Sequence, residues 1–320
     1  MAPGLASAGG YDTSGTRLLA GPRGEGASDR ILDLDGNVVA RLPVVGIATW
    51  VGPDTVAVLG DRTELLFDVR TGTSIHPAAF TRDSQTVFAE PDGRFAWVAN
   101  GFPNLLQRFD VTTGAPVGQP LDVFFVQSVN VDRDRGSVLV THATEQDWIT
   151  TRFDLASGRE LGSGMPGVVR SVVSLDGTAI GNDGSGDLTE FAAGDLAPNA
   201  KVPGARSAPS SLQLSADGRR LLVTAPDQSV QLLDVATRTR LGDALTSRAP
   251  DGTTGGWLRP DGLAVVVNGD AGIVEWSLDP ERLLQAACTL AGRNLTRTEW
   301  ATYVGDVPYA RTCPDQPAGA

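Results

Sequence analysis

The sequence is poor in the residues that most often build metal sites and nucleotide-binding sites. It has two histidines, His76 and His142, two cysteines, and one lysine, Lys201. Two histidines exclude a multi-histidine metal site. A phosphate-binding loop ends in Gly-Lys followed by Ser or Thr, and Lys201 stands in no such sequence. We therefore expect no resident metal, no cofactor and no nucleotide hydrolysis by this chain.

Positive charge and long apolar runs are also scarce. The 38 acidic residues outnumber the 26 basic ones, which gives a net charge of −12. All but one of the basic residues are arginine, which we attribute to a GC-rich genome. Direct binding of nucleic acid needs clustered positive charge, so we expect none by this chain. No apolar run approaches the roughly 18–20 residues that span a bilayer, and residues 1–10 do not resemble a secretory signal. We expect a cytoplasmic protein without a membrane segment.

Two sequence markers recur with a period of about 40 residues. The first marker is an aromatic residue or Leu, followed by Asp, then by Val or Leu, then by any two residues, and then by Gly. Its clearest copies lie within Leu66–Gly72, Arg108–Gly114 and Arg152–Gly158. Weaker copies begin at Leu32, Phe191, Leu233 and Trp276. The second marker is a turn that precedes a β-rich run, and its members are Gly15, Asp54, Gly93, Gly136, Gly177, Gly218 and Gly262. Both markers indicate seven units.

Each unit contains three or four short runs rich in Val, Leu and Thr, divided by Asp, Gly or Pro. Four antiparallel strands per 40-residue unit are typical of a propeller blade. The sequence therefore predicts an all-β, seven-bladed, WD-like β-propeller over residues 1–278. Four aromatic residues are predicted to pack between blades: Phe67, Phe109, Phe153 and Trp276. The last unit lacks an outer strand and residues 1–8 are a poor strand, so either the ring closes loosely or a longer natural chain supplies that strand.

Residues 279–320 are predicted to form a helical tail. Asp279 and Pro280 are a helix cap and first residue, and Gly292 is a helix end. A capping box, Thr296 to Glu299, begins a second helix. In this helix Trp300 and Tyr303 are predicted to face one way, and Gly305 to end it.

The tail also resembles a known family. The stretch Ala287–Trp300, which reads ACTLAGRNLTRTEW, with Pro308-Tyr309 and Thr312-Cys313, resembles the closing segment of actinobacterial WD-repeat propellers. Such propellers often form the C-terminal part of STAND-type signalling ATPases, some with a DNA-binding and transcriptional-activation module. The resemblance implies a role in bacterial signalling or transcriptional regulation. The Gly-His and Trp-Asp pairs of the standard WD repeat are absent, so the units are WD-like.

Cys288 and Cys313 leave two alternatives open. A disulfide would close a loop of about 25 residues, which is worth about 3–4 kcal/mol. Two reduced thiols are the alternative, and a cytoplasmic location favours them.

Acidic residues recur in the loops between the second and third strands, which share one rim of a propeller. They are Glu25, Asp61, Glu145, Asp147, Asp187, Asp227 and Asp270. Such a rim favours a basic protein or peptide partner; the alternative is ordinary solvated loops. We therefore expect a non-enzymatic interaction or sensing platform. The alternatives are a lactonase-like or other hydrolase with a site in the central channel, and a surface-exposed binding module with bonded cysteines.

Overall fold

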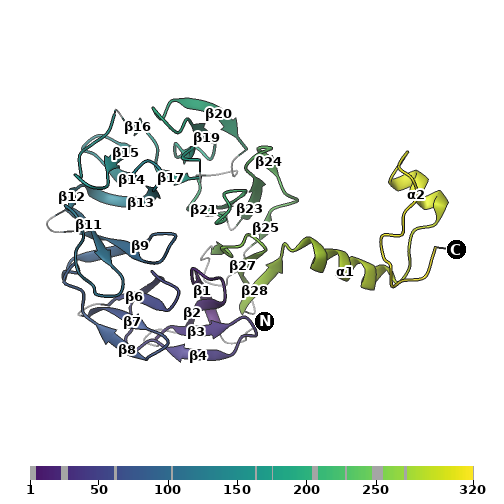
Figure 1. The fold of residues 1–320 in the computed structure, drawn as a ribbon, viewed down its shortest axis with the longest axis horizontal. Helices are drawn as coiled ribbons and strands as arrows, with labels where there is room; N and C mark the ends of the chain where they lie inside the picture. The colour runs from purple at the N-terminus through teal and green to yellow at the C-terminus, as the bar shows by residue number, and fades with distance from the viewer. Residues whose placement is uncertain are drawn as a thin grey trace. The chain divides into compact units, whose positions relative to one another are not determined.

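The computed structural model describes residues 5–22, 28–60, 63–101, 104–162, 164–174, 176–203, 208–227, 229–246, 255–269 and 272–319. The chain divides into two compact units, Met1–Glu275 and Trp276–Ala320. The first unit is a ring of seven antiparallel sheets that follow one another in chain order (Figure 1). The predicted seven-bladed β-propeller is therefore confirmed. The division between the units falls inside the last strand, whereas the predicted boundary follows residue 278.

The strands of each blade pair in sequence order, from the inner strand to the outer one. Blades one to three contain β1 (Leu5–Tyr11), β2 (Arg17–Pro22), β3 (Arg30–Asp33), β4 (Val38–Arg41), β5 (Ile47–Trp50), β6 (Thr55–Leu59), β7 (Glu64–Asp68), β8 (Thr73–Ile75), β9 (Ser84–Ala89), β10 (Phe95–Asn100), β11 (Leu105–Asp110) and β12 (Leu121–Asp122). Blades four and five contain β13 (Phe124–Asp132), β14 (Ser137–Ala143), β15 (Trp148–Asp154), β16 (Met165–Pro166), β17 (Arg170–Val173), β18 (Ala179–Asn182), β19 (Leu188–Phe191) and β20 (Pro198–Val202). Blades six and seven contain β21 (Ser211–Leu214), β22 (Arg220–Thr224), β23 (Ser229–Asp234), β24 (Thr239–Arg240), β25 (Leu245–Thr246), β26 (Gly256–Leu258), β27 (Ala264–Gly269) and β28 (Gly272–Ser277). Within the described residues, the seventh blade consists of the three strands β26, β27 and β28, so its outer strand is missing, as the sequence predicts.

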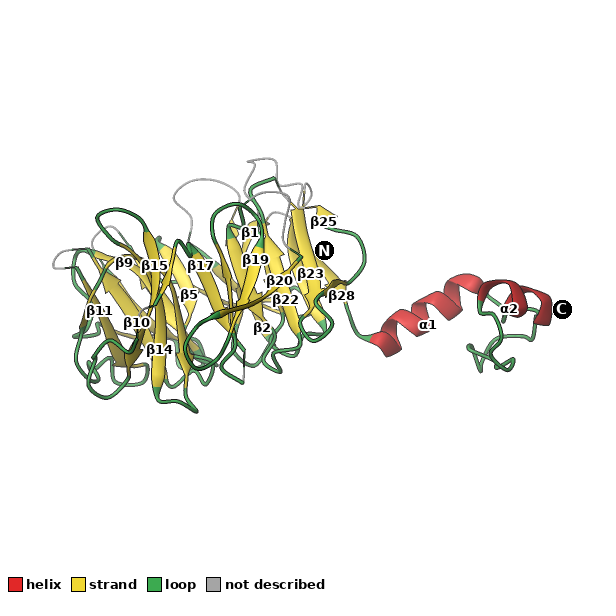
Figure 2. Cartoon of the chain, turned by 90° about the horizontal axis from the view of Figure 1, so that it is seen from above, coloured by secondary structure: helices red, strands yellow, loops and turns green. Residues whose placement is uncertain are grey.

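The antiparallel order gives the propeller two distinct faces (Figure 2). We call the "turn face" the one that carries the connections between first and second strands and between third and fourth strands. The "loop face" carries the connections between second and third strands and those from blade to blade. The predicted turn residues all lie between a first and a second strand. Gly93, for example, has φ of 64° and a Cβ there would approach Gly52 Cα to 2.9 Å, so the turn requires glycine.

The first sequence marker forms the turn between third and fourth strands. In the third blade, Asp110 Oδ1 accepts the N–H groups of Thr112 and Thr113 at 3.0 and 2.9 Å. The same aspartate in other blades, Asp68, Asp154 and Asp234, accepts an N–H three residues on. The marker's last position is left-handed in five blades, with φ of 71° at Gly72, 69° at Gly114, 69° at Gly158, 59° at Leu196 and 54° at Arg238. The marker therefore encodes a turn.

The core lies between neighbouring blades. Phe67, Phe109 and Phe153 are buried there as predicted, and Phe109 packs edge-to-face on Phe80 with ring centroids 5.1 Å apart. The prediction for Trp276 is wrong, because half of this residue is exposed. Trp276 lies on β28, and no described strand covers β28 on its outer side.

The ring closes by side-chain packing between the first and seventh blades. Residues 5–8, part of the segment 1–8 described as a poor strand, belong to the inner strand β1 of the first blade, so for them that description is wrong: pairing with β2 compensates for weak strand propensity. Trp257 packs against Tyr11 and lies close to Gly10, where a Cβ would approach its ring to 2.9 Å. The Tyr11 hydroxyl donates to Glu275 Oε2 at 2.7 Å. Burial and this carboxylate raise the pKa of Tyr11.

The tail unit contains α1 (Pro280–Ala291) and α2 (Arg297–Tyr303). The predicted caps are present: Asp279 accepts the N–H of Glu281, Gly292 ends α1 with φ of 66°, and Thr296 and Glu299 form the capping box. Trp300 and Tyr303 lie three residues apart on α2, but only Trp300 is covered: it is 7% exposed and Tyr303 77%. The chain beyond Gly305 folds over Trp300, whose Nε1 donates to the Val307 carbonyl at 2.7 Å.

Candidate functional site

Carboxylates on the turn face are bound by arginines within the propeller. Glu90, whose side chain is fully buried, accepts bonds from Trp97 Nε1 at 2.9 Å and from Arg108 Nε and Nη2 at 2.6 and 2.8 Å. Arg133 of the next blade adds a contact to Glu90 at 3.2 Å and one to Asp92 at 2.5 Å. These carboxylates are neutralised inside the fold.

Further arginines join one blade to the next on the turn face. Arg17 of the first blade pairs with Asp54 of the second at 2.6 Å. Arg238 of the sixth blade binds both oxygens of Glu190 in the fifth at 2.8 Å. Three other guanidinium groups donate to backbone carbonyls of the following blade, namely Arg135 to Asp176, Arg152 to Ala193 and Gly194, and Arg220 to Gly262. The high arginine content, which we attribute to genome composition, therefore also supplies contacts that hold neighbouring blades together.

The loop face carries the predicted acidic rim. Glu145 and Asp147 lie between β14 and β15, Asp187 immediately precedes β19, and Asp227 lies between β22 and β23. All four residues are exposed. Three further predicted members, Glu25, Asp61 and Asp270, lie outside the described residues.

The rim carboxylates differ in their partners from the arginine-bound carboxylates Asp54, Glu90 and Glu190. Glu145, Asp147 and Asp187 form no ion pair with another residue in the described part of the chain. Asp147 Oδ1 accepts only the N–H of the adjacent Trp148, at 2.7 Å, and Asp227 Oδ1 accepts from Ser229. The negative charge of Glu145, Asp147 and Asp187 therefore faces solvent.

The turn-face end of the central channel holds a cavity of about 430 Å³. Inner strands of all seven blades line it, with Tyr11, Trp50, Asn130, Val172, Leu212 and Leu258 as examples. The two carboxylates in its wall, Asp12 and Glu90, already have internal partners: Asp12 accepts the N–H groups of Thr16 and Arg17 and the hydroxyls of Ser14 and Thr16. The described residues contain no cluster of three or more His, Cys, Asp or Glu that could hold a metal.

His142, the histidine nearest the acidic rim in sequence, lies within the fourth blade. Its Nε2 lies 3.1 Å from Thr151 Oγ1 and its Nδ1 3.1 Å from the Ala143 carbonyl. Burial lowers the pKa of this imidazole. These contacts support a packing role.

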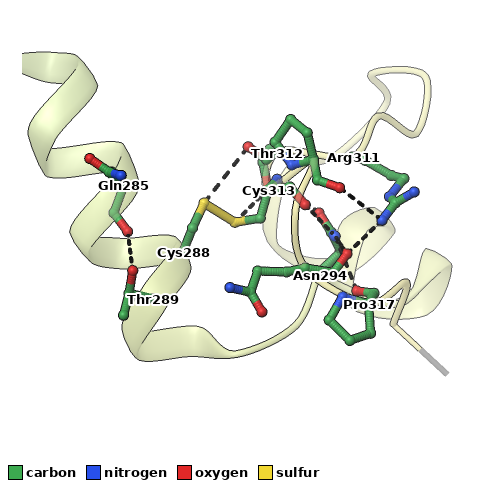
Figure 3. Close-up of a disulfide and its surroundings, with 10 residues drawn as sticks. Gln285, Cys288, Thr289, Asn294, Arg311, Thr312, Cys313 and Pro317 are labelled. Carbon is green, nitrogen blue, oxygen red and sulfur yellow. Dashed lines mark hydrogen bonds between the residues drawn. A yellow bond between two sulfur atoms is a disulfide. The ribbon is translucent and has the colours of Figure 1, made fainter.

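In the tail unit, Cys288 and Cys313 form a disulfide (Figure 3). Beside it, the buried Asn294 donates from Nδ2 to the carbonyls of Cys313 at 2.8 Å and Pro317 at 3.1 Å. Its Oδ1 accepts the N–H of Cys313 at 2.9 Å. Asn294 was not predicted from the sequence, although it lies within Ala287–Trp300; a polar residue just beyond the helix end at Gly292 was the available signal.

Nearby, Arg293 forms a bidentate ion pair with Glu299, with contacts of 2.7 and 2.8 Å. The guanidinium lowers the pKa of the Glu299 carboxyl to about 2. This pair reinforces the capping box at the start of α2.

Comparison with known proteins defines the fold class. No protein-family model matches the chain, and no curated protein matches it. Among solved structures the chain is similar to Kuenenia stuttgartiensis hydrazine synthase, with a TM-score of 0.64 and 14% identity over 86% of this chain and 96% of that chain. This likeness supports the seven-bladed propeller and nothing finer. No helix among the described residues is long and apolar enough to cross a membrane.

Proposed function

We propose that the propeller is a non-enzymatic interaction platform that binds a protein partner through its loop face. The observation that carries this proposal is the exposed, unpaired charge of three loop-face carboxylates. Carboxylates such as Glu90 and Asp54 on the turn face are paired with arginines, whereas Glu145, Asp147 and Asp187 on the loop face point into solvent without ion pairs to described residues.

The geometry favours binding of an extended surface. The rim residues come from three neighbouring blades, the fourth, fifth and sixth. Buried apolar side chains and arginine contacts hold these three blades to one another. A rigid ring fixes the spacing of these loops, so little conformational entropy is lost when a partner binds. Clustered negative charge increases the association rate and the specificity for a basic partner.

The resemblance of the tail supports a finer proposal. Because Ala287–Trp300 resembles the closing segment of propellers in bacterial signalling ATPases, we place the platform in signalling or transcriptional regulation. The partner would then bind the loop face, while any ATPase or DNA-binding activity would belong to other modules.

The disulfide favours a second candidate, a surface-exposed binding module. Disulfides persist in oxidising compartments and are rare in the cytosol, and Cys288 and Cys313 are bonded. This bond argues against the cytoplasmic location expected from the sequence. Alkylation of free thiols in intact cells, followed by mass spectrometry of the peptide pair, distinguishes the two locations.

The test of the platform is affinity capture with two charge-matched triple variants. The loop-face variant combines Glu145→Gln, Asp147→Asn and Asp187→Asn. The control combines Asp35→Asn, Asp134→Asn and Asp195→Asn, which are exposed on the turn face. We expect the loop-face variant to lose a specific protein that the wild type and the control both retain, because only that variant removes the charge facing the partner. Equal capture by all three proteins would contradict the proposal.

A further inference from the structure

Two adjacent aromatic side chains are exposed on the loop face. Phe124 and Phe125 are 44% and 54% exposed, and their rings pack edge-to-face with centroids 4.2 Å apart. They begin β13, the inner strand of the fourth blade. Single exposed apolar residues are common on protein surfaces, but adjacent exposed aromatic rings are typical of binding surfaces.

The backbone holds both rings outward. In a regular strand, adjacent side chains point to opposite faces, so one of the two would be turned inward. Here the register of β13 with β14 shifts between Phe124 and Val126, and Phe125 has φ of 46°. The irregularity breaks the alternation and presents the pair together.

A small cavity of about 60 Å³ adjoins the aromatic pair. Its wall includes Gln85, Asn100 and Asn104 of the third blade, together with both phenylalanines. The aromatic pair therefore lies at the junction of the third and fourth blades, beside polar groups that can orient a bound chain.

Carboxylates surround this junction. Asp122 precedes Phe124 by two residues, and the loop with Glu145 and Asp147 directly follows Ala143, the register partner of Phe124. Asp83 adjoins the cavity, because its carbonyl accepts the N–H of Gly101 in the cavity wall. The junction is formed by residues 81–85, 99–101, 104, 121–126 and 143–148. In these segments the four exposed carboxylates outnumber the one exposed cation, Arg82.

We infer that Phe124 and Phe125, with the carboxylates Asp83, Asp122, Glu145 and Asp147, form a docking site for a partner segment that carries a bulky apolar residue flanked by Arg or Lys. This inference rests on the proposed function and specifies the partner's chemistry. The apolar residue packs on the two rings, and the cations bind the surrounding carboxylates. A guanidinium can also stack on an aromatic face.

The experiment uses random peptides displayed on phage and selected on the full-length protein. We expect the selected peptides to combine an aromatic or leucine residue with neighbouring arginine or lysine. A synthetic copy of the leading peptide is then titrated against variants by calorimetry. We expect Phe124→Ala and Phe125→Gly each to weaken binding by about tenfold or more, as hot-spot residues do, and added salt to weaken it further.

The variants are chosen so that loss of folding does not imitate loss of binding. Phe125→Gly removes a ring at a position where the positive φ suits glycine, and its thermal unfolding midpoint should stay close to that of the wild type. Ile47→Ala is the matched control, because Ile47 is another exposed apolar residue at the loop face; it should leave the affinity unchanged.

The other outcomes overturn the inference in distinguishable ways. Peptides that bind both phenylalanine variants as tightly as the wild type would move the docking site elsewhere and leave the interaction platform standing. Selected peptides without cationic residues would overturn the assigned partner chemistry. Failure to enrich any peptide would count against both the docking site and the proposed function.

Discussion

Glu90 offers the sharpest test of how the turn face stabilises the propeller. Its fully buried side chain accepts hydrogen bonds from Trp97 and Arg108 and a further contact from Arg133. Glu90→Ala leaves the Trp97 N–H and the Arg108 guanidinium without their acceptor. Removing one partner of a buried ion pair costs about 3–5 kcal/mol. The Arg108 side chain is 17% exposed and can partly rehydrate, so we expect a loss near the lower end, about 3 kcal/mol.

The assay is urea denaturation followed by tryptophan fluorescence, with the midpoint converted to a free energy of unfolding. The matched control is Glu145→Ala, which removes an exposed carboxylate on the loop face without an ion pair to a described residue. Substitutions of this kind change stability by no more than about 0.5 kcal/mol. A loss below about 1 kcal/mol for Glu90→Ala, or an equal loss for both variants, would refute the assignment of structural roles to the two faces.

Three further predictions concern the turns and the tail. Gly114→Ala should destabilise the propeller by at least about 1 kcal/mol more than Gly72→Ala. A Cβ at Gly114 would lie 2.8 Å from Pro77 Cα, whereas a Cβ at Gly72 would have no neighbouring atom within 4 Å. Equal urea midpoints for the two variants would contradict this prediction. The double variant Cys288→Ser, Cys313→Ser should cost the tail unit about 3–4 kcal/mol, seen as faster hydrogen exchange around Asn294 with unchanged exchange in the blades. Hydrogen bonds lower the pKa of Asp110 and Asp154 below the ordinary value of 3.8. Their contribution to the free energy of unfolding is therefore full above that value and is lost as the pH falls through the folded pKa. Asp154→Asn should make the urea midpoint less sensitive to acid, and an unchanged pH profile would contradict this prediction.

The blade count was predictable because turn chemistry is local. Each unit needs a left-handed or tight position between its first two strands, and residues such as Gly93 and Gly136 mark it directly in the sequence. The marker aspartates bind amides only three residues away. Short-range contacts of this kind leave a periodic pattern that one sequence suffices to show.

Ring closure and the aromatic pair were not predictable in the same way. The strand at Leu5–Tyr11 depends on β2 and on Trp257, which lies almost the whole propeller away in sequence. Trp276 follows the repeat pattern but lacks the covering strand that buries Phe67. The exposure of Phe125 depends on a positive φ that its residue type disfavours, although two adjacent aromatic residues in one strand were a usable signal.

The four described rim residues lie between second and third strands, because loop positions follow from strand order. Their role in binding remains a prediction. The arginine contacts to turn-face carboxylates could not be inferred, because partners such as Arg238 and Glu190 come from different blades.

Partner binding at the loop face is tested most directly by carboxylate footprinting of the wild-type protein, free and bound to its captured partner. Carbodiimide labelling followed by mass spectrometry reports each exposed carboxylate separately and needs no substitution. We expect reduced labelling of Glu145, Asp147 and Asp187 in the complex, with unchanged labelling of Asp35, Asp134 and Asp195. Protection of the turn-face residues with unchanged labelling of the loop-face residues would contradict it.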